Sequence, residues 1–181
     1  MTIEELCRRS YDTAVAKGWH EEPRSLGEAI ALFHSEVSEA LECWRDPIHK
    51  LDEIWHVDGK PEGFVIELAD LLIRIADTAE DMKLHFSCTP ISMLGEGYEK
   101  FRIRSNGSVM TAIPEMLSLL HSCLSKAFDC ACLGNSAFYL EDTMRVVGAI
   151  CRHHGLDLEK ALLLKMDYND LRPHRHGGKR A

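Results

Sequence analysis

The fold of this chain is decided by one stretch, Leu26-Gly-Glu-Ala-Ile-Ala-Leu-Phe-His-Ser-Glu-Val-Ser-Glu-Ala-Leu-Glu-Cys43. A similar stretch begins 87 residues later and reads Ile113-Pro-Glu-Met-Leu-Ser-Leu-Leu-His-Ser-Cys-Leu-Ser-Lys-Ala-Phe-Asp-Cys130. Both carry apolar residues at the period of one face of an α-helix. The identical pairs at this offset are Glu28/Glu115, Leu32/Leu119, His34/His121, Ser35/Ser122, Ser38/Ser125, Ala40/Ala127 and Cys43/Cys130. The two stretches therefore predict an internal repeat.

A second pairing, at an offset of 74, places Glu67 on Glu141 and the end of the third predicted helix on the end of the sixth. The change of offset makes the connector of the second copy 13 residues shorter than that of the first. We interpret the chain as two helical hairpins of common origin, packed as a pseudo-symmetric four-helix core. Chance similarity between amphipathic helices is the alternative explanation.

Helical periodicity extends over almost the whole chain, and no stretch alternates regularly enough to predict a strand. The predicted helices span 2–17, 25–45, 62–84, 90–103, 111–132, 137–154 and 157–171. Ser25 and Glu28 are placed to form a capping box at the start of the second helix. Gly18, Pro47 and Gly155 are expected to end helices. The predicted fold class is all-α, a helical bundle.

A single all-α domain is expected over residues 1–181. Its first hairpin spans about 25–84 and carries the acidic residues that could form a site. A degenerate second hairpin spans about 111–154, and a C-terminal helix and tail occupy 157–181. This division follows from the repeat and from the helix boundaries alone.

Composition narrows the function classes. The hydrophobic content of 45% is that of a globular protein, and 29 acidic against 21 basic residues give a net charge of −8. This balance argues against a large nucleic-acid surface, so no nucleic-acid partner is expected. No run approaches the length of a membrane span, and the start lacks the apolar core of a signal peptide. We expect a cytoplasmic protein with no membrane contact, whose seven cysteines, none in a CxxC motif, are reduced thiols.

Two pairs of acidic residues mark a candidate metal site. Glu36-x-x-Glu39 and Glu67-x-x-Asp70 each place two carboxylates on one face of a helix. Glu36 falls inside the apolar arc of its helix and Glu39 on the edge of that arc. In an antiparallel hairpin the four acids can meet at one level, where they would need either protonation or a cation. Oxygen ligands favour hard ions, so Mg²⁺ is expected, with Mn²⁺ possible.

Only the first hairpin keeps these acids. The corresponding residues of the second are Cys123 for Glu36, Lys126 for Glu39 and Met144 for Asp70. A site built on the acids is therefore expected once per chain. For the acidic stripe of the third helix, Glu67 to Asp81, plain solvent exposure is an alternative explanation.

The C-terminal run Lys165-Met-Asp-Tyr-Asn169-Asp-Leu-Arg172-Pro-His-Arg-His-Gly177-Gly178-Lys179 gathers cations at a helix end. Lys165, Asn169 and Arg172 lie at i, i+4 and i+7, on one face of one helix. Such a set suits phosphate oxygens. The alternative is that basic residues collect at a helix C-terminus because of the helix dipole.

Together, the Glu36-x-x-Glu39 and Glu67-x-x-Asp70 pairs and the Lys165-x-x-x-Asn169-x-x-Arg172 run with its closing His-Gly-Gly-Lys resemble the all-α nucleoside triphosphate pyrophosphohydrolases of the MazG type. The lead-ins Gly59-Lys-Pro-Glu-Gly63 and Lys17-Gly-Trp19 are also similar to that family. The resemblance implies Mg²⁺-dependent cleavage of a nucleoside triphosphate between its α and β phosphates, giving a monophosphate and diphosphate. The tandem arrangement is similar to the related dimeric dUTPases, which implies a homodimer.

Residue roles follow from the resemblance. It implies that four acids coordinate Mg²⁺, one of the outer ones also orienting the attacking water: Glu36, Glu39, Glu67 and Asp70. It implies that four residues contact phosphates: Lys165, Asn169, Arg172 and Lys179. The base would stack on Trp44 or Trp19, although core packing is an equally good explanation of Trp44.

Two other classes of function stay open. A di-iron carboxylate bundle also uses inward acids, but it needs Glu-x-x-His on two helices. The sequence holds one such motif, Glu53-Ile-Trp-His56, in a connector. A non-enzymatic helical interaction module is the other alternative, and it predicts no dependence on phosphate or metal.

Overall fold

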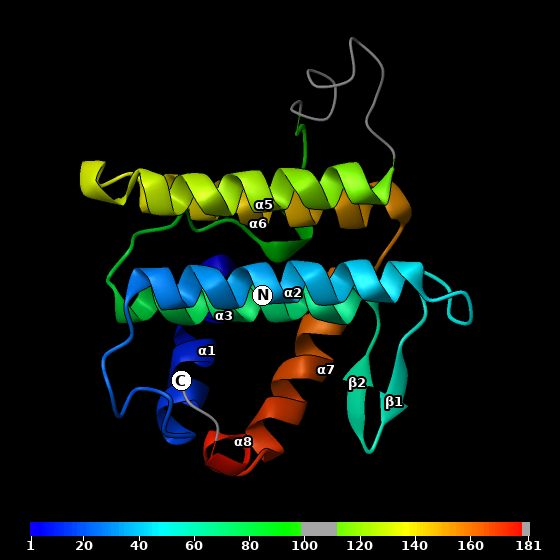
Figure 1. Cartoon of the computed structure of the whole chain (residues 1–181), viewed down its shortest axis with the longest axis horizontal. Helices are drawn as coiled ribbons and strands as arrows, with labels where there is room; N and C mark the ends of the chain where they lie inside the picture. The colour runs from blue at the N-terminus through cyan, green and yellow to red at the C-terminus, as the bar shows by residue number, and fades with distance from the viewer. Residues whose placement is uncertain (99–111, 179–181) are drawn as a thin grey trace.

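The computed structural model describes residues 1–98 and 112–178, and within them the chain is a bundle of α-helices (Figure 1). The helices are α1 (Ile3–Ala16), α2 (Leu26–Arg45), α3 (Phe64–Asp81), α5 (Ile113–Asp129), α6 (Ser136–His154), α7 (Leu158–Leu171) and the short α8 (Arg175–Gly178). Two 3₁₀ turns lie at Ile91–Met93 and Ala131–Leu133. The all-α fold class is confirmed. Lys179, one of the expected phosphate contacts, lies outside the described residues.

The helix predicted at 90–103 is wrong over its described part. Residues 90–98 contain the 3₁₀ turn Ile91–Met93 followed by turns, and 99–103 lie outside the described residues. Gly95 and Gly97 have φ values of +75° and +64°, in the left-handed region that ends helices. A Cβ at Gly95 would also lie 2.1 Å from the backbone nitrogen of Ala149. The chain therefore turns here against α6 instead of continuing as a helix.

A small β-hairpin also departs from the expectation that no strand would form. Strand β1 (Trp55–Val57) pairs antiparallel with β2 (Lys60–Glu62), and α3 starts only after it. Asp58 and Gly59 make the tight turn, with φ values of +51° and +81°. Three-residue strands are too short for alternation to show in the sequence, which is why the pattern missed them.

Local sequence signals set several helix ends as expected. The hydroxyl of Ser25 accepts from the backbone N–H of Glu28, and the Glu28 carboxylate accepts from the N–H of Ser25, which completes the capping box of α2. Asp157 caps α7 by accepting from the N–H of Lys160. Gly155 ends α6 with φ of +68°. No helix within residues 1–98 and 112–178 has the length and apolar character that crossing a membrane requires.

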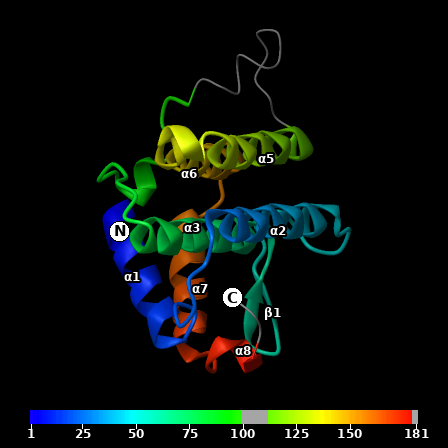
Figure 2. The same cartoon turned by 60° about the vertical axis from the view of Figure 1, so that its left-hand side comes forward.

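The two hairpins form the expected four-helix core. Figure 1 and Figure 2 show α5 and α6 as one layer lying on a second layer made by α2 and α3. Where α2 packs on α5, the rings of His34 and His121 stack, with 2.7 Å between their Nδ1 atoms. These two histidines are an identical pair of the repeat. Contact between equivalent residues is expected where a two-fold axis relates two copies, so this contact supports the interpretation of two related hairpins.

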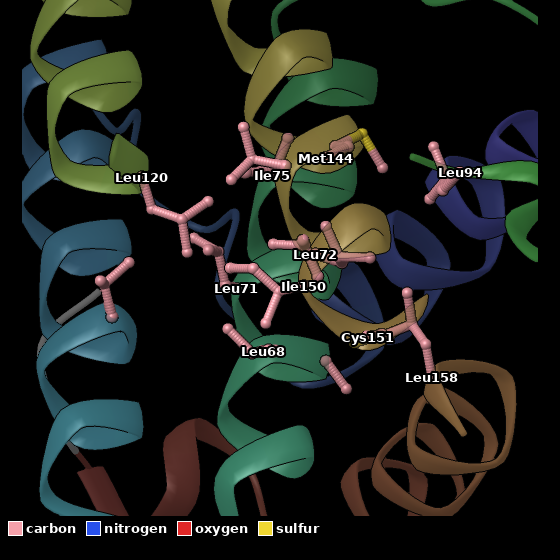
Figure 3. Close-up of a cluster of buried hydrophobic side chains, with 14 of the residues drawn as sticks. Leu68, Leu71, Leu72, Ile75, Leu94, Leu120, Met144, Ile150, Cys151 and Leu158 are labelled. Atoms are coloured by element: carbon pink, nitrogen blue, oxygen red, sulfur yellow. The ribbon is translucent and has the colours of Figure 1, made fainter. Parts of the chain in front are cut away.

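Helix α3 is the centre of the molecule. It packs against α2, α1 and α7, and it also contacts α6. Its apolar side chains Leu68, Leu71, Leu72 and Ile75 meet residues of α5, α6 and the start of α7 in the core (Figure 3). Helices α1 and α7 lie on the side of α3 away from the α5/α6 layer (Figure 2). The polar stripe of α3 thereby lies beside α1, α2 and α7, and two of its residues, Glu67 and Asp77, are buried.

Candidate active site

Three carboxylates meet where α2 and α3 pack together. Glu36 of α2 and Glu67 and Asp70 of α3 each offer one oxygen, and these oxygens all lie within 4.8 Å of one another. The side chains of Glu36 and Glu67 lie at the helix interface, where the two residues are only 3% and 2% exposed. Simple solvent exposure therefore does not explain these acids. Glu39, the fourth expected ligand, is exposed and stands outside the trio.

Two cations partly neutralise the three acids. The Nε of Arg74 lies 2.7 Å from Oε1 of Glu36, and the Nζ of Lys165 lies 2.6 Å from Oδ2 of Asp70. The Lys165 side chain is 1% exposed, so this ion pair is fully buried on the lysine side. The Oε2 atom of Glu67 is buried and has no hydrogen-bond partner among residues 1–98 and 112–178. This oxygen is thus left without a direct partner in the described part of the chain.

Burial changes the ionisation of the two glutamates. Loss of hydration raises the pKa of Glu36 to about 7, with Arg74 opposing the rise and the neighbouring acids adding to it. Loss of hydration and repulsion from Asp70 raise the pKa of Glu67 to about 8, and Lys165 opposes this. Strongly perturbed carboxylates of this kind concentrate at functional sites. A divalent cation among them would favour their charged forms.

A cavity of about 450 Å³ opens beside the acids. It is enclosed by α1, α2, α3 and α7 and by the segment between α1 and α2, and Lys60 reaches it from the β-hairpin. Its walls carry Glu36, Glu39 and Asp70 together with the cationic residues Lys17, Arg24, Lys60, Arg74 and Arg172. Its apolar lining is Ala14, Leu32, Ile73 and Met166 beside Trp19. The cavity is large enough to hold a small phosphorylated molecule.

The residues expected to bind phosphate divide into two groups. Asn169 and Arg172 line the cavity, and the Oδ1 of Asn169 is buried without a hydrogen-bond partner in the described part of the chain. Arg172 stacks on the ring of Tyr168, with its Cζ 5.6 Å from the ring centroid, and forms no ion pair with a described carboxylate. Lys165 is instead buried and forms an ion pair with Asp70. Its charge is therefore directed at a carboxylate of the acidic group.

The two candidate tryptophans are placed differently. Trp19 lies in the wall of the cavity. Trp44 is 43% exposed near the end of α2 and is not among the residues of the cavity wall, so core packing does not describe its position. The structure brings Trp19, and not Trp44, to the candidate site.

Several residues of the site have no clear signal in the sequence. Lys17 and Lys60 stand out there only as parts of lead-in motifs, and Arg74 only as part of an acidic stripe. Arg24 and Asp77 form an ion pair of 2.7 Å in the cavity wall. Spatial neighbours of this kind come from separate elements, so their spacing in sequence carries no signal. Among these residues, only Arg74 gave a signal in the sequence, because it is a basic residue inside an acidic stripe.

The acidic group contains no histidine. His56, from the only Glu-x-x-His motif of the sequence, is exposed on β1 and stands outside the group, and Glu53 precedes the strand. The arrangement gives no support to a di-iron carboxylate site.

Comparisons of the chain with protein-family models, curated proteins and solved structures found no match.

Proposed function

We propose that this chain is a Mg²⁺-dependent nucleoside triphosphate pyrophosphohydrolase, which converts a nucleoside triphosphate and water to a monophosphate and diphosphate. One observation carries the proposal: three carboxylates cluster together, and two of them, Glu36 and Asp70, line a cavity whose other walls supply cations. Acids alone would suit a metal site, and cations alone would suit any anion. Their combination in one cavity of about 450 Å³ suits a metal-bound polyphosphate.

The donor set fits Mg²⁺. Glu36, Glu67 and Asp70 offer oxygen atoms only, which hard divalent cations prefer. The buried, unpartnered Oε2 of Glu67 is an acceptor that a cation would satisfy. When bound, Mg²⁺ offsets the phosphate charge and increases the acidity of water. Mn²⁺ has the same preference for oxygen and is the expected substitute.

The cations of the chain hold the substrate. Arg172 is free of carboxylate partners in the described chain, and its planar guanidinium can bind two phosphate oxygens at once. Asn169 lies one turn away on the same face and can donate from its amide nitrogen. Lys60 reaches the cavity from β2 and is a weaker candidate than Arg172, because its Nζ lies 2.8 Å from Oε1 of Glu62. These three residues position the phosphates beside the acids, and Trp19 supplies a surface on which a base can stack.

Glu39 is placed to assist the attacking water. It is exposed in the cavity wall, one helical turn from Glu36, and does not belong to the group formed by Glu36, Glu67 and Asp70. A hydrated carboxylate there can accept a proton from water as the water oxygen bonds to phosphorus. The bridging oxygen between the α and β phosphates leaves with its electron pair, so that one phosphate group gains the water oxygen and the other keeps the bridging oxygen.

Diphosphate release from the purified chain tests the proposal. We expect release from one or more nucleoside triphosphates only when Mg²⁺ or Mn²⁺ is present, and none from Glu67→Gln. The matched control is Glu141→Gln, because Glu141 occupies the equivalent place in the second hairpin. A chain that neither hydrolyses nor binds nucleotides would favour the non-enzymatic interaction module.

A further inference from the structure

The cavity extends well beyond the acids, toward a second polar group at the other end of α3. Asp77 follows Asp70 by seven residues, or about 10 Å along a helix axis, and both residues line the cavity. Ile73, one helical turn before Asp77, also lines the cavity, and Leu32 and Trp19 add apolar surface to its wall. If the phosphates lie beside the acids, the nucleoside lies here. This placement of the nucleoside rests on the proposed function.

Arg24 is the buried cation of this distal end. Its side chain is 7% exposed, and its Nη2 donates to Oδ2 of Asp77 at 2.7 Å. The other oxygen of Asp77 lies 2.6 Å from Nε2 of His20, whose Nδ1 lies 3.3 Å from Asp81. The guanidinium is therefore held in place by a carboxylate that is itself fixed on both oxygens.

The ion pair with Asp77 compensates the charge of Arg24 but leaves one of its N–H donors without a partner in the described chain. Its Nε–H is buried and has no acceptor among residues 1–98 and 112–178. Buried donors without a partner are rare in folded proteins, because the lost hydration is not replaced. Ser10 of α1 also lines the cavity, is 4% exposed and has a hydroxyl with no partner in the described residues. Two residues of the cavity wall, Ser10 and Arg24, thus each carry a buried polar group without a partner in the described residues.

The chemistry of these groups selects a neutral acceptor. A phosphate would be drawn to cations that lack a carboxylate partner, such as Arg172, whereas the charge of Arg24 is cancelled by Asp77. Arginine can only donate, so it suits the carbonyl oxygen of a base. Guanine, hypoxanthine, cytosine and uracil carry such an oxygen. Adenine carries an amino group where guanine and hypoxanthine carry the 6-oxo group, and in the same position in the site this amino group would face a donor.

We propose that Arg24 makes this site selective for nucleotides whose base carries a ring carbonyl, and that it discriminates against adenine. Asp77 and His20 serve as positioning residues for Arg24. A site built around a hydrogen bond rejects an analogue that cannot form it, since the buried group of the protein is left unpaired. For one such contact the expected discrimination in kcat/KM is about 10- to 100-fold.

Inosine triphosphate and ATP provide the matched test, because they differ in the 6-oxo or 6-amino group and in the proton on N1. We expect kcat/KM of the native chain to favour inosine triphosphate by about 10- to 100-fold. The ratio should fall to near unity in Arg24→Gln, and to an intermediate value in Arg24→Lys, which keeps a cation for Asp77. A ratio is independent of the fraction of folded enzyme, so loss of stability alone cannot change it.

Arg8→Gln is the control, because Arg8 is exposed on α1 and outside the cavity wall. Its ratio should equal that of the native chain. Equal kcat/KM for the two nucleotides in the native chain, a preference for ATP, or an unchanged ratio in both Arg24 variants would each overturn the inference while leaving the proposed function intact. Failure to release diphosphate from any nucleoside triphosphate would instead overturn the proposed function itself.

Discussion

The two hairpins of this chain have the same arrangement of helices, but equivalent acidic residues in them lie in different electrostatic environments. Glu67 of α3 and Glu141 of α6 occupy equivalent positions in the repeat. Glu67 is 2% exposed, has an unpartnered oxygen and has a pKa raised to about 8. Glu141 accepts hydrogen bonds from the backbone and hydroxyl of Ser87 and from Arg145, and these bonds lower its pKa. The equivalent glutamate thus has its hydrogen bonds satisfied in the second hairpin and has an oxygen without a described partner in the first.

The neighbouring positions show the same contrast. Glu36 and Asp70 of the first hairpin correspond to Cys123 and Met144 of the second, which are 4% and 0% exposed and pack in the hydrophobic core. Natural sequences tend to satisfy their buried groups, and departures from this rule concentrate at functional sites. The second hairpin therefore represents the fold without the site. In the first hairpin, the candidate site requires buried acids whose loss of hydration is only partly compensated.

The largest expected effect compares the two equivalent glutamates. Glu67→Gln should reduce kcat by about 1,000-fold or more, to the limit of detection, since it removes a charged oxygen ligand that would hold the metal ion, while Glu141→Gln should leave kcat within about two-fold. Steady-state diphosphate release from the two variants measures this. Full activity in Glu67→Gln, or equal losses in both variants, would remove the metal site from the first hairpin.

A smaller effect is expected for the cation that lacks a carboxylate partner. Arg172→Ala should lower kcat/KM by about 10- to 100-fold, because a charge-assisted contact to phosphate contributes about 1.5–3 kcal/mol. Arg145→Ala, which removes the ion pair to Glu141 in the second hairpin, is the matched control and should leave kcat/KM unchanged. Kinetics measured beside melting temperatures separate the two roles. Unchanged kinetics for Arg172→Ala would leave that arginine as a helix-end cation only.

The raised pKa values of Glu36 and Glu67 predict how stability changes with pH. Without metal, the folded state holds their protons up to about pH 7 and 8, whereas the unfolded state releases them near the ordinary value of 4.5. The folded chain therefore binds more protons between these limits, and the free energy of unfolding contributed by these groups falls as pH rises from about 5 to 8.

Thermal unfolding in chelator measures this contribution. The melting temperature of the native chain should decline over that pH range more steeply than that of Glu36→Gln. Mg²⁺ should raise the melting temperature more at pH 8 than at pH 6, because the acids are then charged and bind it. Parallel pH profiles for the native chain and the variant would show that burial of Glu36 carries no such cost.

The acids of the site lie on long helices and could be predicted, whereas Arg24 and Lys60, which lie outside the predicted helices' periodic faces, could not. Glu36 stood out because a charged residue interrupted the apolar face of its helix. The helix wheel also put Glu39 on the edge of that face, and it is exposed in the structure. Helical periodicity fixes such positions to within a fraction of a turn.

Arg24 and Lys60 come from segments without a periodic signal. Arg24 immediately precedes the N-cap of α2, and Lys60 sits in a three-residue strand that the pattern did not indicate. Their side chains reach the cavity only because α3 packs against α1, α2 and α7. Trp44 lies one residue before the end of α2 and is 43% exposed, so its place on the helix did not by itself decide its burial. Tertiary packing decided these positions.

The smallest expected effect concerns an attempt to rebuild the second site. Lys126→Glu restores the counterpart of Glu39 at an exposed position and should change neither kcat nor melting temperature appreciably. Adding Cys123→Glu places an acid at a buried position beside Asp142, with Met144 still in the position of Asp70, so stability should fall by a few kcal/mol. Mg²⁺ has no ligand in a thioether, and the second hairpin lacks the enclosing cations that line the cavity of the first. Titration with a nonhydrolysable triphosphate should therefore give one site per chain for the native protein and for both variants. A stoichiometry of two would show that a hairpin with restored acids is enough to bind nucleotide, and that the helices packed around α3 do not determine where it binds.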